Sequence, residues 1–308
     1  MDPEQIHIQA DLRGLIEGDV HCDPLFTQLY ASDASIYEIK PLGVARPRST
    51  RDVSELLKYC HEHQLSVFPR GGGSGLAGQS LGRGLIVDFS RYMRRIHPPR
   101  DGTVRAQAGV VQADLNRSID NYDLLFGPDP ATRSVSSIGS MLSVDAAGSH
   151  FPRYGSAGDC VESMQVVLSS GEVVELSRHP WGGLPPATEP TMFASSVFGL
   201  PSFSAQHAHR SQAADRMGLG AMPAQGGLAD AAPSSSALRV QQLAQQVGLL
   251  LQQNSALLLR PPRQDVARNC GFQVEKVLDG DQVNLARLMC GAEGTLGVIT
   301  EATVRVEE

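Results

Sequence analysis

The sequence lacks the features that mark several large classes of protein. It has no surplus of basic residues, because 26 Lys and Arg stand against 33 Asp and Glu, a formal net charge of -7 at pH 7. Binding to nucleic acid requires a surface rich in Lys and Arg, so we expect no nucleic-acid partner. No run of about 18 apolar residues is present, and none follows the first Met, so we expect neither a membrane span nor a signal peptide. These absences favour a cytoplasmic protein.

Cysteine is scarce and scattered. The chain has five Cys, an odd number, and no two of them form a C-x-x-C pair. Disulfide frameworks and cysteine-bound metal centres need closely spaced or paired thiols, so we expect neither, and no metal site, in this chain. The thiols are expected to be reduced packing residues, with a reactive thiol at Cys290 as the alternative because it precedes a Gly-rich loop.

The composition is that of a folded protein. Of 308 residues, 41% are hydrophobic and 19% are charged, and this length suits two domains or one domain with an insertion. Val53, Leu56, Leu57 and Cys60 recur at helical spacing between short apolar stretches at 44–45 and 65–68. This pattern predicts a β-α-β start, followed by a glycine loop at 70–78 and a buried strand at 85–89.

Helices and strands continue to alternate in the remainder. The patterns predict a strand at 103–108, helices at 111–120 and 138–147, and a hairpin of strands at 164–168 and 172–176. Residues 178–236 are dominated by Pro, Ala, Ser, Gly and Gln, which predicts a linker or insertion. A helix at 238–251, a helix at 285–289 and a strand at 298–306 are expected to follow it.

The glycine-rich stretch PRGGGSGLAGQ at 69–79 is the most informative part of the chain. Glycines allow positive φ and bring several backbone N–H groups close to an anion, as phosphate and pyrophosphate binding requires. Gly73 to Gly78 spell G-x-G-x-x-G, but only six residues separate Gly78 from the strand at Leu85, which leaves no room for the helix of a Rossmann site. No Lys-Ser or Lys-Thr follows the glycines, so a kinase-type P-loop is also excluded.

Three further glycine-containing stretches follow the loop along the chain. They are GPDP at 127–130 running on to SIGSM at 137–141, RYGSAGD at 153–159, and GAEGTLGVIT at 291–300. Together the four stretches resemble the FAD-binding PCMH-type superfamily, which includes D-lactate, glycolate and D-2-hydroxyglutarate dehydrogenases. The resemblance covers roughly residues 25–178 and 264–306 and is closest to members fused to an iron-sulfur C-terminal part.

The resemblance implies an α+β fold with FAD in the cleft between two lobes, at about 25–88 and 103–306. We accordingly expect an N-terminal extension (1–24), an FAD-binding domain (25–177), a low-complexity linker (178–236) and the remainder of the second lobe (237–308). In the family the groups that bind substrate and metal lie mostly in a C-terminal part, which here would begin beyond Glu308. The chain is therefore expected to be the FAD-binding part of a longer enzyme.

The resemblance also implies a set of cofactor-binding residues. They are Arg70, Gly71, Gly72, Gly73, Ser74, Gly75, Gly78 and Gln79 at the pyrophosphate; Pro128, Asp129, Ser137, Ile138 and Gly139 along the ribityl chain and flavin ring; and Gly155, Asp159, Val298 and Ile299 near the ribose and adenine. Ser74 stands where relatives with covalently attached FAD commonly have His, which implies dissociable, non-covalent FAD. The sequence departs from the family pattern at Ser140 and at 143–148, so the fit is weaker around the flavin ring.

Several of these residues have a structural alternative. Arg70 is also typical of a solvated loop cation, Gly155 of a turn, Asp159 of a cap, and Val298 and Ile299 of core strand residues. Glu293 is either a loop hydrogen-bonding group or a cofactor ligand. No catalytic residue is assigned; His150, near the presumed flavin edge, is the candidate general base, and a surface histidine is the alternative.

The implied function is that of an FAD-dependent oxidoreductase that oxidises a 2-hydroxyacid and passes electrons to an acceptor such as an iron-sulfur protein or domain. Three alternatives stay open. The first is a flavin-binding electron-transfer subunit that needs a separate catalytic chain. The second is an inactive fragment, and the third keeps the fold for a sugar oxidase or nucleotide-sugar reductase.

Overall fold

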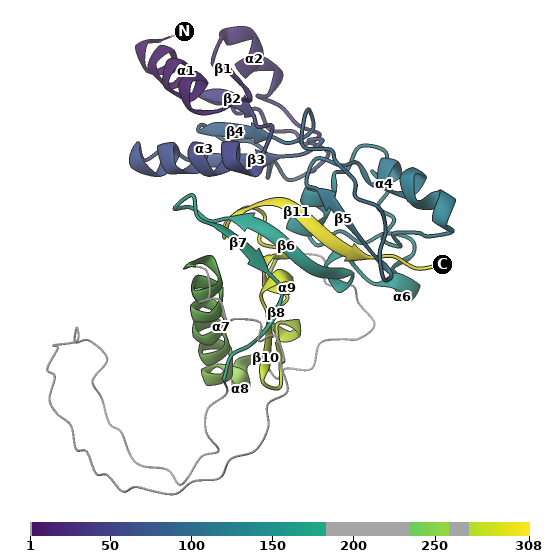
Figure 1. Ribbon diagram of the computed structural model, residues 1–308. Helices are drawn as coiled ribbons and strands as arrows, with labels where there is room; N and C mark the ends of the chain where they lie inside the picture. Colours follow the sequence, from purple (N-terminus) through teal and green to yellow (C-terminus); the bar gives the residue numbers. More distant parts are fainter. Residues whose placement is uncertain (1, 183–234, 259–270) are drawn as a thin grey trace, which may run out of the picture. The chain divides into compact units, whose positions relative to one another are not determined.

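The computed structural model describes residues 2–182, 235–258 and 271–308 (Figure 1). In these residues the strands form three sheets, of which two have four strands and one has three. Helices lie against each sheet, and most strand pairs are antiparallel. This mixture is the expected α+β class.

The first sheet contains the strands that flank the glycine loop. They are β1 (Asp19–His21), β2 (Gly43–Arg46), β3 (Val67–Arg70) and β4 (Leu85–Asp88). Their order is β1-β2-β4-β3; β2 and β3 run parallel to β4, whereas β1 is antiparallel to β2. The glycine loop therefore leads from β3 directly to the neighbouring strand β4, as the short spacing predicts.

Three helices accompany this sheet. They are α1 (Pro3–Leu15), α2 (Pro24–Leu29) and α3 (Thr50–Glu62). Helix α3 connects β2 to β3, begins at the N-cap Ser49, and buries the predicted apolar face that includes Val53, Leu56 and Cys60. Helix α1 contacts both α3 and β1, so most of the first 24 residues pack with this sheet. The β-α-β prediction is confirmed, with β3 beginning two residues later than expected.

The second sheet joins distant parts of the chain. Its strands are β5 (Thr103–Gln107), β6 (Val161–Val167), β7 (Val173–Leu176) and β11 (Val298–Arg305). Their order is β5-β11-β6-β7, with every pair antiparallel, so the last strand of the chain lies between two earlier ones. The predicted β6–β7 hairpin is confirmed, and Gly171 takes φ +81° in its turn.

Short helices cover this sheet. They are α4 (Gln112–Ile119), α5 (Ile138–Ser143) and α6 (Phe151–Tyr154), with 3₁₀ turns η1 (Asp120–Tyr122) and η2 (Ala157–Asp159). Helix α5 packs on the sheet through Ile138 and Leu142, both fully buried. It ends at Ser143 rather than at the predicted residue 147, because Asp145 takes φ +51°, in the left-handed region, which stops a right-handed helix.

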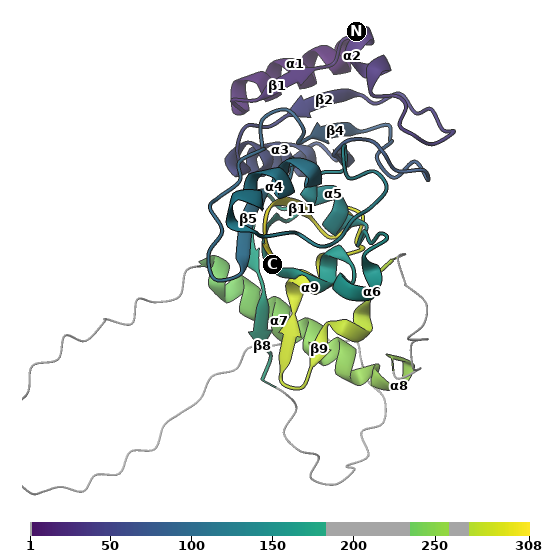
Figure 2. The same ribbon diagram turned by 90° about the vertical axis from the view of Figure 1, so that its right-hand side faces the viewer.

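The third sheet is small and lies beside α7 in both views (Figure 1, Figure 2). Its strands are β8 (Arg178–Pro180), β9 (Leu278–Asp279) and β10 (Gln282–Asn284), in the order β8-β10-β9. The nearby helices are α7 (Ser235–Gln253), α8 (Ser255–Leu258), α9 (Leu285–Met289) and the 3₁₀ turn η3 (Val274–Lys276). Val240, Ala244 and Leu251 on α7 are buried against the core.

The predicted linker at 178–236 is wrong at both ends. Strand β8 occupies its first residues, and the buried ring of Trp181 packs against Gly248 of α7. Composition did not reveal β8, because its partner β10 lies about 100 positions further along the chain. Helix α7 begins inside the other end of the predicted linker, and residues 183–234 lie outside the described part of the chain.

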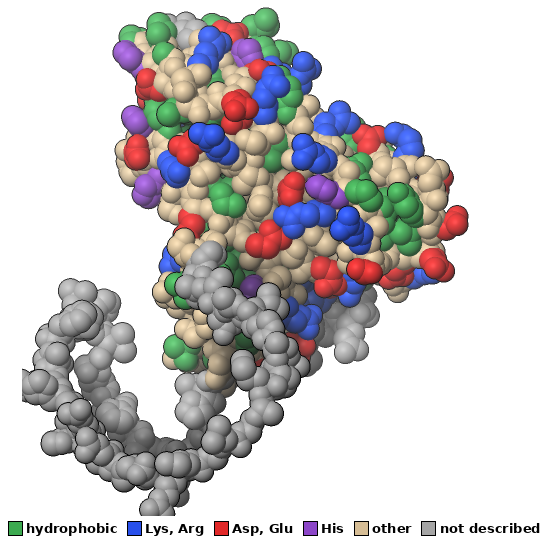
Figure 3. Space-filling model, viewed as in Figure 1, with side chains coloured by type: hydrophobic (Ala, Val, Ile, Leu, Met, Phe, Trp, Pro, Cys, Tyr) green, Lys and Arg blue, Asp and Glu red, His purple; other side chains and the backbone are tan. Residues whose placement is uncertain are grey.

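The surface carries both signs of charge. Figure 3 shows Lys and Arg side chains interspersed with Asp and Glu over the face in view. Among the helices that the structure describes, none combines the length and the apolar character needed to cross a membrane.

Candidate functional site

The glycine loop presents a row of unused backbone donors. Within the described residues, no carbonyl or side chain accepts a hydrogen bond from the backbone N–H groups of residues 72–78. Gly73 takes φ +63°, a left-handed conformation that favours glycine. A partly exposed loop whose consecutive N–H groups are free is suited to bind an anion.

The loop packs directly against the N-terminus of α5. A Cβ atom at Gly71 would lie 2.4 Å from Ser137 Oγ and 3.1 Å from Ser140 Oγ, so only glycine fits without a shift. Ser137 and Ser140 form a capping box in which each side chain meets the other's backbone N–H. The first sheet and the second sheet are thereby brought together at this point.

Arg70, at the end of β3, is held by the chain that precedes β2. Its guanidinium donates to the carbonyls of Tyr30 at 3.3 Å and Ser32 at 2.8 Å, and it lies 5.1 Å from the centre of the Tyr30 ring. Tyr30 in turn donates to Asp88 Oδ2 at 2.6 Å, and burial together with this carboxylate raises the pKa of the tyrosine. Arg70 therefore braces the glycine loop besides facing the pocket described next.

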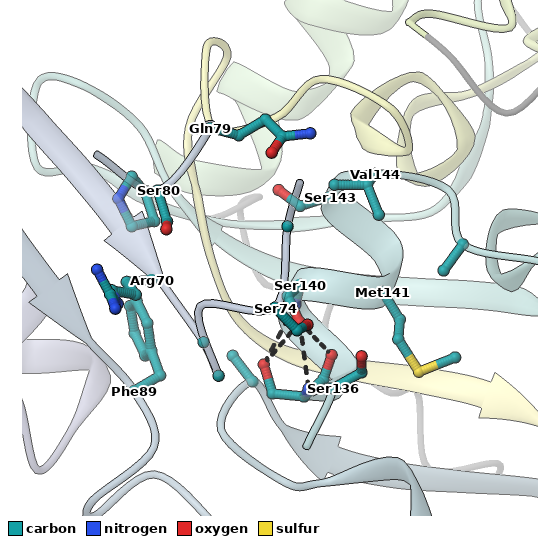
Figure 4. Close-up of a pocket in the computed structure, with 18 of the residues that line it drawn as sticks. Arg70, Ser74, Gln79, Ser80, Phe89, Ser136, Ser140, Met141, Ser143 and Val144 are labelled. Atoms are coloured by element: carbon teal, nitrogen blue, oxygen red, sulfur yellow. Dashed lines mark hydrogen bonds between the residues drawn. The ribbon is translucent and has the colours of Figure 1, made fainter. Parts of the chain in front are cut away.

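These elements surround a pocket of about 420 Å³. Figure 4 shows Arg70 and Phe89 on one side of it, Met141 and Val144 on the other, and hydroxyl groups between them. Phe89 follows β4 directly, and Met141 and Val144 belong to α5 and its end. The volume lies in the range of small-molecule and cofactor sites, which is about 300–1,000 Å³.

The C-terminal segment completes the pocket. Glu293, Gly294, Gly297 and Ile299 line it, although they are far from the glycine loop in sequence. The backbone N–H of Glu293 donates to the carbonyl of Ser143 at 2.9 Å, which joins this segment to the end of α5. The lining thus contains free donors, several hydroxyls, and apolar side chains of Met141 and Ile299.

The structure brings many of the predicted site residues together, but not all. Those that line the pocket are Arg70, Gly71, Gly72, Gly73, Ser74, Gly75, Gln79, Ser137, Gly139 and Ile299. Those outside its lining are Gly78, Pro128, Asp129, Ile138, Gly155, Asp159 and Val298. Ile138 and Val298 are 0% and 4% exposed, so their side chains serve the core.

Asp159 has the geometry of a cap. Its carboxylate accepts hydrogen bonds from the backbone N–H and the hydroxyl of Ser156, both at 3.0 Å, and from Lys276 Nζ at 2.7 Å. Burial acts to raise the pKa of Asp159, but these hydrogen bonds hold the pKa below its ordinary value. The side chain is therefore used within the protein, which is the alternative that the sequence leaves open.

His150 and Asp129 form a separate cluster. His150 Nε2 lies 3.7 Å from Asp129 Oδ2, and Asp129 also accepts from Arg133 at 3.0 Å and Ser149 at 3.1 Å. The His150 side chain is 47% exposed and does not line the pocket. Its position agrees with the surface-histidine alternative.

Sequence reasoning missed part of the lining. The additional residues are Pro69, Ser80, Phe89, Ala108, Pro130, Thr132, Ser136, Ser140, Met141, Ser143, Val144, Ala146, Gly294 and Gly297. Glu293, for which the sequence leaves a cofactor role open, also lines the pocket. A usable signal was present in α5, where Ser140 and Ser143 are three positions apart and so lie on one face of the helix. Phe89 and Ala108 each follow the carboxyl end of a strand, where ligand sites often form.

The described cysteines are buried thiols. Burial raises the pKa of Cys60 and Cys290 to about 12, and the pKa of Cys22 and Cys160 to about 11. Cys290 is 0% exposed, and its thiol donates to the carbonyl of Ala286 at 3.4 Å, which favours the packing role over the alternative of a reactive thiol. In the part of the chain that the structure describes, no group of three or more His, Cys, Asp or Glu is placed to hold a metal ion.

Comparison with known families identifies the domain. A family model described as an FAD binding domain matches residues 41–177, which contain the glycine loop, α5 and the β6–β7 hairpin. This chain contains an FAD-binding domain. The predicted resemblance to FAD-linked dehydrogenases and the FAD cofactor are confirmed, and three of the four stretches that carry the resemblance lie within the matched residues.

This FAD-binding domain has relatives among characterised enzymes. It is 37% identical over 155 residues to a D-2-hydroxyglutarate dehydrogenase of Escherichia coli (strain K12), covering 49% of this chain and 15% of the relative. A second D-2-hydroxyglutarate dehydrogenase, of Pantoea ananatis (strain AJ13355), is 30% identical over 283 residues, covering 90% of this chain and 23% of the relative. The chain thus spans less than a quarter of the length of either enzyme.

The FAD-binding domain also has a solved neighbour. The structure of an alkyldihydroxyacetonephosphate synthase matches with a TM-score of 0.59 at 17% identity, covering 100% of this chain and 40% of the other. At this identity the likeness shows a shared fold alone. It agrees with the α+β, two-lobed architecture expected of the family.

The residues of the pocket fit FAD in two respects. The free N–H groups of 72–78 and the close approach at Gly71 suit a pyrophosphate, which needs donors and no obstructing side chains. Ala108, Met141 and Ile299 supply an apolar wall suited to a flat ring, next to hydroxyls of Ser137 and Ser140 that suit a polyol chain.

Proposed function

We propose that this chain is the FAD-binding part of a flavin-dependent oxidoreductase that oxidises a 2-hydroxyacid such as D-lactate, D-2-hydroxyglutarate or glycolate. The pocket carries this proposal, because it joins a donor-rich glycine loop to an apolar wall within one volume of about 420 Å³. Similarity to two D-2-hydroxyglutarate dehydrogenases supports the substrate class.

In the proposed arrangement each wall of the pocket has one task. The backbone donors of residues 72–78 hold the pyrophosphate, and the capping box of Ser137 and Ser140 lies along the ribityl chain. Met141, Val144 and Ile299 exclude water from the ring, which keeps the reacting centre in a low-dielectric environment. When bound, FAD supplies the two-electron acceptor for the hydride of the substrate α-carbon, and the protein orients it.

The pocket lining has few groups for an organic acid. Among the described lining residues Arg70 is the one cation, its guanidinium is already bonded to two carbonyls, and no histidine faces the cavity. A hydroxyacid needs a cation for its carboxylate and a base near its hydroxyl. This observation favours the second candidate, a flavin-binding electron-transfer subunit that depends on a separate catalytic chain or part. For either candidate we propose an iron-sulfur protein or domain as the electron acceptor.

The first experiment is reconstitution. The purified chain is incubated with FAD, freed of excess, and its visible spectrum recorded, where a bound flavin absorbs at about 450 nm. D-lactate, D-2-hydroxyglutarate and glycolate are then added anaerobically, with L-2-hydroxyglutarate as the control. Bleaching by one acid but not by the control supports substrate oxidation by this chain. A band without bleaching supports the second candidate, and absence of the band refutes FAD binding.

The same sample tests the mode of attachment. We propose non-covalent FAD, because Ser74 offers a hydroxyl where a histidyl link would need an imidazole, and the described lining contains neither His nor Cys. Acid precipitation should leave the flavin in the supernatant. Flavin in the protein pellet would refute non-covalent binding. The cytoplasmic location stays a prediction.

A further inference from the structure

Asp145 occupies an unusual position in the wall of the pocket. It follows the end of α5 and lies between Val144 and Ala146, both of which line the pocket. Its backbone takes φ +51°, and the residue is 1% exposed. The left-handed conformation after a helix is usually taken by Gly or Asn, so a buried Asp here needs a compensating interaction.

The carboxylate of Asp145 receives that interaction from three other parts of the chain. Oδ1 accepts from the backbone N–H of Gly158 at 2.8 Å and from Arg287 Nη1 at 2.9 Å. Oδ2 accepts from Arg287 Nη2 at 3.1 Å and from Gln273 Nε2 at 2.6 Å. The guanidinium therefore binds the carboxylate through two parallel hydrogen bonds, a geometry that fixes orientation as well as distance.

The guanidinium of Arg287 is buried and closely surrounded by other residues. It is 3% exposed, and a Cβ at Gly158 would lie 1.5 Å from its Nη1, so glycine is required there. Burial acts to lower the pKa of Arg287, but the hydrogen bond and charge of Asp145 raise it, so the group stays charged. Nε is buried without a hydrogen-bond partner among the described residues. A buried ion pair with an unpaired donor is a poor stabiliser, which indicates a role in geometry.

The pair lies where two separate stretches of chain build the pocket. Arg287 belongs to α9, and the segment that follows it supplies Glu293 and Ile299 to the lining. Two backbone hydrogen bonds, from Gly291 to Leu142 at 3.2 Å and from Glu293 to Ser143 at 2.9 Å, join that segment to the end of α5. The ion pair therefore holds the two walls in register.

We propose that Asp145 and Arg287 are positioning residues for FAD. Through their paired hydrogen bonds they hold Val144 and Ala146 in the pocket wall and align α5 with the C-terminal segment. They set the affinity and the environment of the flavin without touching it. This inference rests on the proposed binding of FAD in the pocket.

The experiment compares the full chain with two variants and a matched control. Arg287→Met removes the guanidinium; the double variant Asp145→Asn with Arg287→Met removes both charges while keeping a residue that tolerates left-handed φ. The control, Arg105→Met, removes an arginine on β5 of the second sheet that forms ion pairs with Glu175 at 2.8 Å and Glu301 at 2.7 Å. None of these three residues lines the pocket. FAD dissociation constants, spectra at saturating FAD, and Tm without FAD are measured for each.

We expect Arg287→Met to raise the FAD dissociation constant at least about tenfold and Arg105→Met to change it less than about threefold. The double variant should recover much of the Tm lost by Arg287→Met, because no unpaired charge is buried, yet keep the weak binding and a shifted flavin spectrum. If Arg287→Met does not fold, the FAD dissociation constant and the flavin spectrum of the double variant test the positioning role instead. Wild-type affinity and spectrum in the double variant would overturn the positioning role. Failure of the wild-type chain to retain FAD would refute the proposed function itself and is recognised before any variant is compared.

Discussion

Replacing Gly71 by Ala should weaken FAD binding by about 5- to 150-fold. The new Cβ would lie 2.4 Å from Ser137 Oγ and 3.1 Å from Ser140 Oγ, so the glycine loop or the N-terminus of α5 must move. Overpacking of this kind costs about 1–3 kcal/mol. If the clash is relieved only when the loop leaves its binding conformation, this cost appears in full as a loss of FAD affinity of about 5- to 150-fold. Gly71 is not among the positive-φ residues, so its backbone conformation suits Ala and the clash alone causes the loss.

Gly14→Ala, on helix α1 and away from the pocket, is the matched control. Its Cβ would meet nothing within 4 Å, and Gly14 also lacks a positive φ. We expect less than about a twofold change in affinity for this variant. In a Ser137→Ala background, Gly71→Ala should weaken FAD binding by a smaller factor than it does in the wild type, because the nearest clashing atom is already absent.

The assay is an FAD titration of the apo protein followed by quenching of flavin fluorescence, with Tm recorded for each variant. Ser137→Ala alone should cost about 1 kcal/mol of stability through the lost cap, so affinities are compared only among folded samples. Equal weakening by Gly71→Ala and Gly14→Ala would refute the steric reasoning. So would wild-type affinity in Gly71→Ala.

Two further predictions concern titratable groups. The pKa of Asp159 is held below its ordinary value, so its contribution to stability is complete above about pH 4, the unfolded value, and is lost as the pH falls through the folded-state pKa. The difference in free energy of unfolding between wild type and Asp159→Asn, measured by urea denaturation, should therefore shrink between pH 7 and pH 3; an unchanged difference would contradict the assignment. Cys60 and Cys290, with pKa values of about 12, should resist iodoacetamide at pH 8 until the protein unfolds, because only about 1 thiol in 10⁴ is ionised. Peptide mapping by mass spectrometry that finds native Cys290 modified within minutes would show that it is accessible.

Local patterns in the sequence were sufficient for much of the fold. The helical spacing of Val53, Leu56 and Cys60 predicted α3, and the short distance between Gly78 and Leu85 predicted a loop that joins two strands. The glycine loop could be recognised because the small residues that leave its N–H groups free are adjacent in the sequence. These features depend on neighbours along the chain, so periodicity and turn chemistry report them.

The remainder of the site was decided by contacts between distant residues. The helix that contains α5 ends four residues earlier than the sequence predicts, at a left-handed Asp145 whose carboxylate is bound by Arg287, 142 positions away. Strand β8 was missed for the same reason, since its partner β10 follows about 100 positions later. Pairing energies of this kind leave no periodic trace in either segment. The sequence by itself therefore determined the glycine loop and the family, whereas only the tertiary structure decided which side chains meet the loop across the pocket.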